Sequence, residues 1–368
     1  MILLKMIGII LAAAAAVLFV LTLGVPVFLL VCPAVGRLPD KNARKALEKR
    51  SSHYDGGQFR NEHDIRTVSG KPYPSSSRRK PETPIRAGTP SFLSASREGE
   101  VSFTWLGHSS FLLQVGGINI LADPVLSERC SPVGFLGPKR YSERPLSAEE
   151  LPRIYVLFVS HDHYDHLDHR TILSLRDRVG TFLVPLGIDS VLAGWGVDPK
   201  KILALDWWES AGIGGVTFTL TPSQHFTGRD PLRRNATLWG GVYISGGSRR
   251  IYYTGDGGYC EVFRNVRERL GAPDLMIAEC GQYDPAWAGV HMFPEETMLA
   301  GLDCGTSWLI PVHWGTFSIC NHAWDDPIRR VTAAAEASGL SLAAPRIGQT
   351  AEYSQIIRHT TRWWEEHS

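Results

Sequence analysis

Residues 160–168 read Ser-His-Asp-His-Tyr-Asp-His-Leu-Asp, and they directly follow the wholly apolar run at residues 154–159. A short apolar run of this kind is typical of a strand buried on both faces. The stretch after it crowds three imidazoles and several carboxylates into one tight turn. Because so many metal-binding groups are costly to pack together without a cation, the stretch predicts a metal site at the end of a strand.

The spacing within this turn supports a metal site. In an extended chain, side chains two residues apart lie on the same face, so His161 and His163 would point together. The turn would then bring Asp165 and His166 to a second point nearby, which fits one ion or two adjacent ions. The alternative is a polar loop whose histidines are unrelated, or which cap the helix expected from about residue 168.

Other metal-binding side chains follow later strands in the same way. His225, Asp256 and His313 each come just beyond a segment with the pattern of a strand. The carboxyl ends of neighbouring strands in α/β proteins meet at one edge of the sheet. We therefore expect a site with two metal ions whose ligands are His161, His163, Asp165, His166, His225, Asp256 and His313.

The order of the predicted elements indicates an α/β fold. Residues 101–121 read as a meander of strands, and residues 154–205 alternate strands with helices. Asp123, at the end of the meander, could be a simple turn residue or could hydrogen-bond to the histidine turn and brace it. The loop at residues 137–141 is expected near the mouth of the site, where Lys139 and Arg140 could contact a phosphate or simply be solvated.

The amino-terminal residues 2–35 are apolar except for Lys5 and Thr22. As a helix, this run is long enough to cross a hydrocarbon core of about 30 Å. A transmembrane anchor over residues 1–35 is the favoured interpretation. A cleaved signal peptide is the alternative, although the run is longer than the usual apolar region of such a peptide.

Charge and composition suggest how the rest of the chain is organised. Residues 36–98 form a basic linker rich in proline and serine, and residues 99–368 form the expected catalytic domain. The positive-inside rule predicts a single-pass membrane protein with this domain on the cytoplasmic side. The same basic cluster could lie against anionic lipid. Its residues are Arg37, Lys41, Arg44, Lys45, Lys49 and Arg50.

The charge composition gives no sign of a nucleic-acid partner. Basic and acidic residues number 38 and 37, which gives a net charge of +1. No nucleic-acid partner is therefore expected. The six cysteines contain no Cys-x-x-Cys pair, as is typical of buried reduced thiols. The oligomeric state stays open, with a homodimer among the alternatives.

The turn at residues 161–166, followed in order by His225, Asp256 and His313, resembles the metallo-β-lactamase superfamily. The resemblance implies an αββα sandwich and two zinc ions per chain, held by the seven predicted ligands. It gives one ion to His161, His163 and His225, the other to Asp165, His166 and His313, and makes Asp256 the bridge.

Further motifs are similar to the N-acylphosphatidylethanolamine-hydrolysing phospholipase D family and its bacterial relatives. They include Thr-Trp-Leu-Gly-His-Ser at residues 104–109, Gly-Pro-Lys-Arg at 137–140 and His-Trp-Gly-Thr-Phe at 313–317. This likeness implies a phospholipid substrate, with Tyr164 and His291 binding its head group. The chain departs from the pattern in its amino-terminal apolar segment and at Phe226, where a tryptophan is expected.

The mechanism implied is hydrolysis of a phosphodiester by a water that two zinc ions make more acidic. Asp256 and Asp165 would be the catalytic carboxylates, the first positioning the ions and the second accepting a proton. Five aromatic residues could line an acyl groove or belong to the core: Trp207, Trp208, Trp287, Phe293 and Trp324.

Three other functions remain as alternatives. One is a metallohydrolase of a soluble substrate, either a lactonase or a nucleotide phosphodiesterase. Another is a diiron redox enzyme, although such members of the superfamily have a carboxylate where this chain has His163. The third is a lipid-binding protein without activity, which the complete ligand set disfavours.

Overall fold

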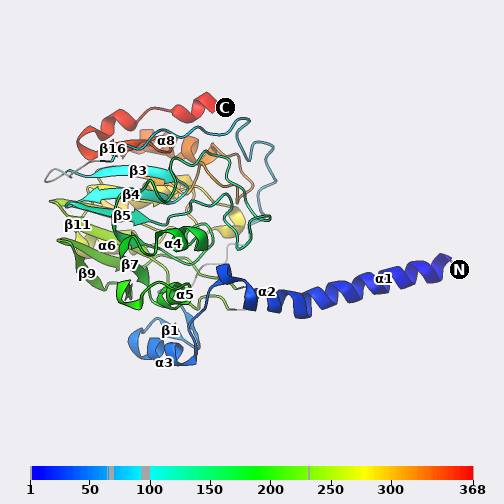
Figure 1. Cartoon of the computed structure of the whole chain (residues 1–368). Helices are drawn as coiled ribbons and strands as arrows, with labels where there is room; N and C mark the ends of the chain where they lie inside the picture. Colours follow the sequence, from blue (N-terminus) through cyan, green and yellow to red (C-terminus); the bar gives the residue numbers. More distant parts are fainter. Residues whose placement is uncertain (1, 64, 66–69, 93–99, 231–232, 368) are drawn as a thin grey trace.

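The computed structural model describes residues 2–63, 65, 70–92, 100–230 and 233–367. Two seven-stranded sheets pack face to face with helices outside them, as Figure 1 shows. The predicted αββα sandwich is therefore confirmed. The boundary predicted between residues 98 and 99 lies outside the described residues.

The first sheet has the strand order β16-β3-β4-β5-β6-β7-β8. Strands β3 to β5 form the expected antiparallel meander, and β5 to β8 run parallel. The histidine turn follows β6, as predicted. The strands are β3 (Ser102–Gly107), β4 (Ser110–Val115), β5 (Ile118–Ala122), β6 (Ile154–Phe158), β7 (Val179–Pro185), β8 (Ile202–Leu205) and β16 (Thr350–Glu352).

The second sheet has the order β15-β14-β13-β12-β11-β10-β9. Strands β12, β13 and β14 are parallel neighbours, so their carboxyl ends meet at one edge. Strand β13, which lies between the other two, was not expected from the sequence. The strands are β9 (Ser210–Ile213), β10 (Val216–Thr221), β11 (Gly241–Gly246), β12 (Arg249–Tyr253), β13 (Leu275–Glu279), β14 (Trp308–Val312) and β15 (Ser341–Leu342).

Apolar side chains from both sheets fill the space between them. In β4, Phe111 and Leu113 belong to this central core, whereas Leu112 joins a second cluster outside the sheet. This alternation follows from the two-residue period of a strand. The ring of Phe111 meets that of Tyr253 from the opposite sheet edge to face, with 5.0 Å between the centroids. Such contacts keep the two sheets at a constant separation, so their carboxyl edges can share one site.

Helices cover the outer faces of both sheets. Ile172 of α4 and Val191 of α5 belong to the apolar cluster outside the first sheet. Helices α6, α7 and α8 pack in series, and α7 contacts β13 of the second sheet. The bounds are α4 (His169–Leu175), α5 (Ile188–Gly194), α6 (Val262–Leu270), α7 (Pro294–Cys304) and α8 (Asp326–Ser338).

The amino-terminal apolar segment is helical and projects away from the domain (Figure 1). It consists of α1 (Ile2–Phe19), a π-helical turn (Val20–Gly24) and α2 (Val25–Val31). Within it, Lys5–Val31 spans 27 residues with a mean hydropathy of 2.8. At 1.5 Å per residue that is about 40 Å, so this helix could cross a membrane by length and composition. A signal sequence would meet the same criteria.

The segment between this helix and the domain packs on the domain. It contains α3 (Lys41–Arg50) and a hairpin of β1 (Tyr54–Asp55) and β2 (Gln58–Phe59). The guanidinium of Arg78 lies 2.8 Å from the carboxylate of Asp325, and the side chain of Asn61 donates to the carbonyl oxygen of His225. The segment therefore reaches a residue predicted to bind metal.

Candidate metal centre

Three imidazoles converge at the end of β6. The Nδ1 atom of His163 lies 2.9 Å from Nε2 of His161 and 3.3 Å from Nε2 of His225, which follows β10. Burial lowers the pKa of all three side chains, that of His163 to about 3. Because neutral imidazole is the form that binds metal, these three nitrogens suit a cation.

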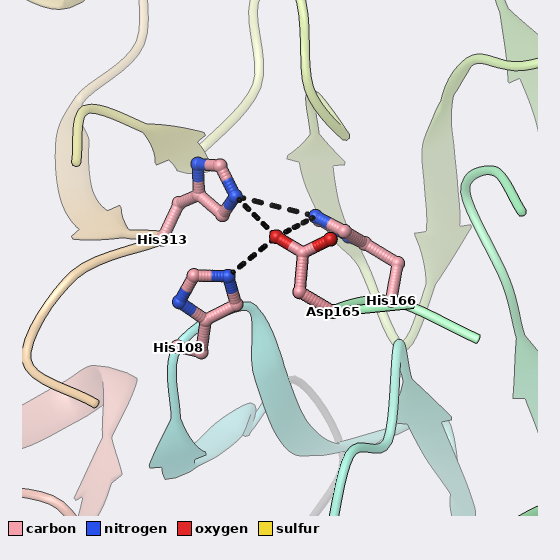
Figure 2. Close-up of side chains that lie close together, drawn as sticks. All are labelled: His108, Asp165, His166 and His313. Carbon is pink, nitrogen blue, oxygen red and sulfur yellow. Dashed lines mark hydrogen bonds and ion pairs between the residues drawn. The ribbon is translucent and has the colours of Figure 1, made fainter. Parts of the chain in front are cut away.

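A second group lies beside the first and is shown in Figure 2. Its centre is Oδ2 of Asp165, which is 3.0 Å from Nε2 of His108, 3.3 Å from Nε2 of His313 and 3.7 Å from Nε2 of His166. Asp165, His166 and His313 were expected as ligands, but His108 was not. His108 occupies the turn between β3 and β4, and its carbonyl oxygen accepts a hydrogen bond from the backbone N–H of His313.

Asp256, which follows β12, lies between the two groups. Its Oδ2 is 3.1 Å from Nε2 of His166, 3.2 Å from Nε2 of His313 and 3.9 Å from Nε2 of His161. Its Oδ1 is buried and has no hydrogen-bond partner among the described residues. A buried carboxylate oxygen without a partner is costly. A cation would supply that partner, so the residues present fit the metal ions that the fold family implies.

The carboxylates also set the charge of the imidazoles around them. Burial lowers the pKa of His313, but the charge of Asp256 and hydrogen bonds to Asp165 and Glu279 outweigh it, and the pKa rises to about 9. Burial raises the pKa of Asp165, yet His166 and the hydrogen bonds from His108 and His313 hold it well below its ordinary value. The second group therefore keeps an ionised carboxylate in a buried position.

Asp123 hydrogen-bonds to the histidine turn and braces it. Of the two roles considered for Asp123, this is the bracing role and not that of a simple turn residue. It accepts hydrogen bonds from the backbone N–H and the hydroxyl of Ser160, at 2.7 and 2.5 Å. Its Oδ2 also lies 2.7 Å from Nδ1 of His166 and accepts a hydrogen bond from the hydroxyl of Tyr253. Because Tyr253 belongs to the second sheet, Asp123 links both sheets to the imidazole of His166 and sets its orientation.

The backbone is strained where these groups meet. Of the described non-glycine residues, six have a positive φ, and three of them surround the site: His108 at 51°, Asp123 at 40° and His313 at 69°. Side chains with a Cβ rarely adopt this region, which costs on the order of 1–3 kcal/mol per residue. Such strain is common where packing forces a side chain toward a functional site.

Glu279 contacts the site but was not predicted from the sequence. Its carboxylate lies 3.0 Å from Nδ1 of His291 and 3.2 Å from Nδ1 of His313, and it accepts the backbone N–H groups of Gly257 and Met292. Burial would raise its pKa, but the two histidines lower it to about 2. The available signal was an apolar run at residues 275–278 that ends in a carboxylate.

We expect Glu279→Gln to weaken metal binding by about 10–100-fold, because a partner that orients a ligand histidine contributes on that scale. A titration with a competing chelator would measure this. Glu295→Gln is the matched control, since Glu295 lies on α7 and pairs with Arg330 at 2.6 Å. Equal metal affinity of the Glu279 variant and the wild type would contradict this role.

The two predicted substrate-binding residues lie in different surroundings. His291 lines the cavity above the metal ligands, and its ring stacks on that of His313 at 5.5 Å between centroids. Tyr164 is not in that lining. Its hydroxyl donates to the carbonyl oxygen of Arg229, and its ring lies 4.1 Å from the Arg229 guanidinium carbon.

The cavity has a volume of about 190 Å³ and opens over both groups. Of the five aromatic residues considered for an acyl groove, Trp287 lines it, whereas Trp207 and Trp324 belong to the core. The lining consists of His163, Asp165, Phe226, Asp256, Gln282, Trp287, Val290, His291, His313 and Ile319. The lining therefore combines four apolar side chains with metal-binding groups.

A two-sheet sandwich with such a centre at its carboxyl edge defines a metal-dependent hydrolase. Residues 118–314 match the family model described as "Beta-lactamase superfamily domain", and the chain belongs to the metallo-β-lactamase superfamily. The solved metallo hydrolase Igni18 of Ignicoccus hospitalis is similar in fold, with a TM-score of 0.54 and 18% identity over 69% of this chain and 98% of that one.

Two relatives show closer likeness in sequence. An uncharacterised protein of Mycobacterium tuberculosis is 36% identical over 88% of this chain and 90% of its own length. N-acyl-phosphatidylethanolamine-hydrolyzing phospholipase D 1 of Caenorhabditis elegans is also 36% identical, over 58% of this chain and 64% of the worm protein. The resemblance to the N-acylphosphatidylethanolamine-hydrolysing phospholipase D family is thus confirmed.

Proposed function

We propose that this protein is a membrane-anchored phosphodiesterase of phospholipase D type that uses two zinc ions to cleave N-acylphosphatidylethanolamine-like phospholipids. The observation that carries the proposal is the cavity, whose lining contains both metal-binding side chains and apolar side chains. Such a site suits a substrate with a phosphate at one end and acyl chains at the other. The likeness to the worm phospholipase D supports this substrate class.

The chain's own residues have distinct roles in this proposal. His161, His163 and His225 would bind one ion, Asp165, His166 and His313 the other, with Asp256 between them. Bound zinc would make a water more acidic and offset the charge that develops on the phosphate. The ionised Asp165 lines the cavity, so it is placed to accept a proton from the attacking water.

The remaining residues would position the substrate. His291 lines the cavity. Because its Nδ1 hydrogen-bonds to the Glu279 carboxylate, its Nε2 would be free to bind the phosphodiester. Tyr164 would act indirectly, by holding Arg229 beside the histidine turn, since its ring and hydroxyl both contact Arg229. The amino-terminal helix would confine the enzyme to the bilayer that contains its substrate. By the positive-inside rule, the catalytic domain would face the cytoplasm.

The experiment that tests the proposal compares substrates and counts metal. Purified full-length protein is assayed on vesicles containing N-acylphosphatidylethanolamine, on sugar lactones and on bis-p-nitrophenyl phosphate, and its zinc and iron are measured by elemental analysis. We expect release of phosphatidic acid from the vesicles and two zinc ions per chain. Faster turnover of lactones, or iron at full occupancy with little zinc, would refute the proposal.

Trp287→Ala tests whether the apolar part of the lining binds an acyl chain. Trp287 lines the cavity and is 38% exposed, so an acyl chain would cover it. We expect KM for a long-chain substrate to rise about tenfold, because burying an aromatic side chain contributes about 1.5–3 kcal/mol. Turnover of bis-p-nitrophenyl phosphate should stay near the wild-type rate. Leu299→Ala, which replaces an exposed leucine on α7, serves as the control. An equal rise in KM in both variants would show that Trp287 does not bind the acyl chain.

A further inference from the structure

The loop between Cys130 and Arg140 exposes two large apolar side chains. Phe135 is 82% exposed and Leu136 is 67% exposed. Among the described residues outside the amino-terminal helix, Phe135 is the most exposed large hydrophobic side chain. Exposing two neighbouring apolar side chains at a loop tip is unfavourable in water, so contact with an apolar surface would stabilise this tip.

This loop lies beside the point where the amino-terminal helix joins the domain. The thiol of Cys32 is 3.8 Å from the carbonyl oxygen of Pro132. A hollow of about 310 Å³ lies between residues 32–34 and residues 131–134. The helix junction is attached to the domain, since Trp195 donates to the carbonyl oxygen of Pro33. A helix that crosses a bilayer places its junction at the head groups, so the loop would lie at the same level.

A cluster of positive charge adjoins the loop. A second hollow, of about 450 Å³, has four basic side chains in its lining and no carboxylate. The loop residues Gly137 and Pro138 also line it, so the charges follow the apolar tip directly. Near an anionic membrane surface each such cation strengthens binding by about fivefold. The four are Arg79, Lys80, Arg129 and Lys139.

The same hollow adjoins the mouth of the metal centre. Ser318 lines the basic hollow, and the next residue, Ile319, lines the cavity above the metal ligands. Arg140, the other basic residue of the predicted phosphate loop, is buried instead and donates to the carbonyl oxygen of Val125. Lys139 is therefore the member of that pair that faces solvent.

We propose that residues 131–139 form a second membrane contact, in which Phe135 and Leu136 insert between acyl chains while Arg79, Lys80, Arg129 and Lys139 bind the head groups of anionic phospholipids. This contact rests on the proposed transmembrane anchor but not on the proposed hydrolysis. Together, the helix and the loop hold the domain at two points, so the cavity opens at the bilayer surface.

The test uses the full-length chain in lipid nanodiscs, with p-benzoylphenylalanine in place of Phe135. The matched control carries it in place of Ile357, which is 64% exposed and lies in the short helix after β16. In Figure 1, β16 and α2 are on opposite sides of the domain. After irradiation, the fraction of protein carrying a lipid adduct is measured by intact mass. We expect a yield at position 135 at least about tenfold above that at 357, since only the former would lie among acyl chains.

The charges are tested in the same assay. Raising phosphatidylglycerol from none to about 30 mol % should increase the adduct at position 135 several-fold, and the K80E/K139E double substitution should remove that increase. Protein that stays in the nanodisc with equal yields at both positions, or without the dependence on anionic lipid, would overturn the second contact alone. Protein that does not remain in the nanodisc would overturn the anchor and this contact together, whatever its activity on soluble phosphodiesters.

Discussion

Asp256→Asn is expected to lower turnover of a phosphodiester substrate by at least about 10³-fold, the largest effect that we predict for a single substitution. Asp256 lies within 4 Å of imidazole nitrogens from both groups of metal-binding side chains. An amide of the same size keeps the packing but removes the negative charge. The variant would then lack the charged carboxylate that lies between the two groups of metal-binding side chains. We therefore expect fewer than two zinc ions per chain.

The control for this variant is Asp303→Asn. Asp303 pairs with Tyr259 and Arg264 on the outer side of the second sheet, so its loss should change turnover by no more than about twofold. Zinc content and the rate with excess zinc are measured for both variants. If Asp256→Asn retained two zinc ions and wild-type turnover, the metal centre proposed around this carboxylate would be excluded.

Arg229→Ala is expected to cause the largest loss of stability. The guanidinium is buried and donates to the carbonyl oxygens of Ala34, Asp162 and Leu167. It also offsets the charge of the Asp162 carboxylate, whose pKa burial raises. Removing one member of such a buried network leaves the others without partners and costs about 3–5 kcal/mol.

For a chain of this size, that loss corresponds to a fall of about 5 °C in Tm, measured by thermal unfolding in detergent. Arg60→Ala is the control, because Arg60 and its partner Asp55 are 65% and 75% exposed. Such an exposed ion pair contributes less than about 1 kcal/mol, so its Tm should change little. A Tm of the Arg229 variant that equals that of the Arg60 variant would show that the buried network does not stabilise the fold.

The sequence predicted much of the fold because its signals are local. The apolar residues of β4 and the apolar run of β6 each indicate a buried strand within a few residues. The same local pattern placed a metal-binding side chain after β6, β10, β12 and β14. Parallel strands have a common direction, so side chains at their ends were expected to meet, and the structure brings the seven predicted ligands together.

Only the tertiary structure decided which other groups join them. Glu279 reaches His313 because β13 pairs between β12 and β14, and His108 reaches Asp165 because the β3–β4 turn lies against the residues after β14. Tyr164 is inside the predicted turn, yet its side chain contacts Arg229 and not the cavity. These contacts join residues from about 30 to more than 200 positions apart in the sequence. Local periodicity carries no information on such pairings, because the packing of the two sheets determines them.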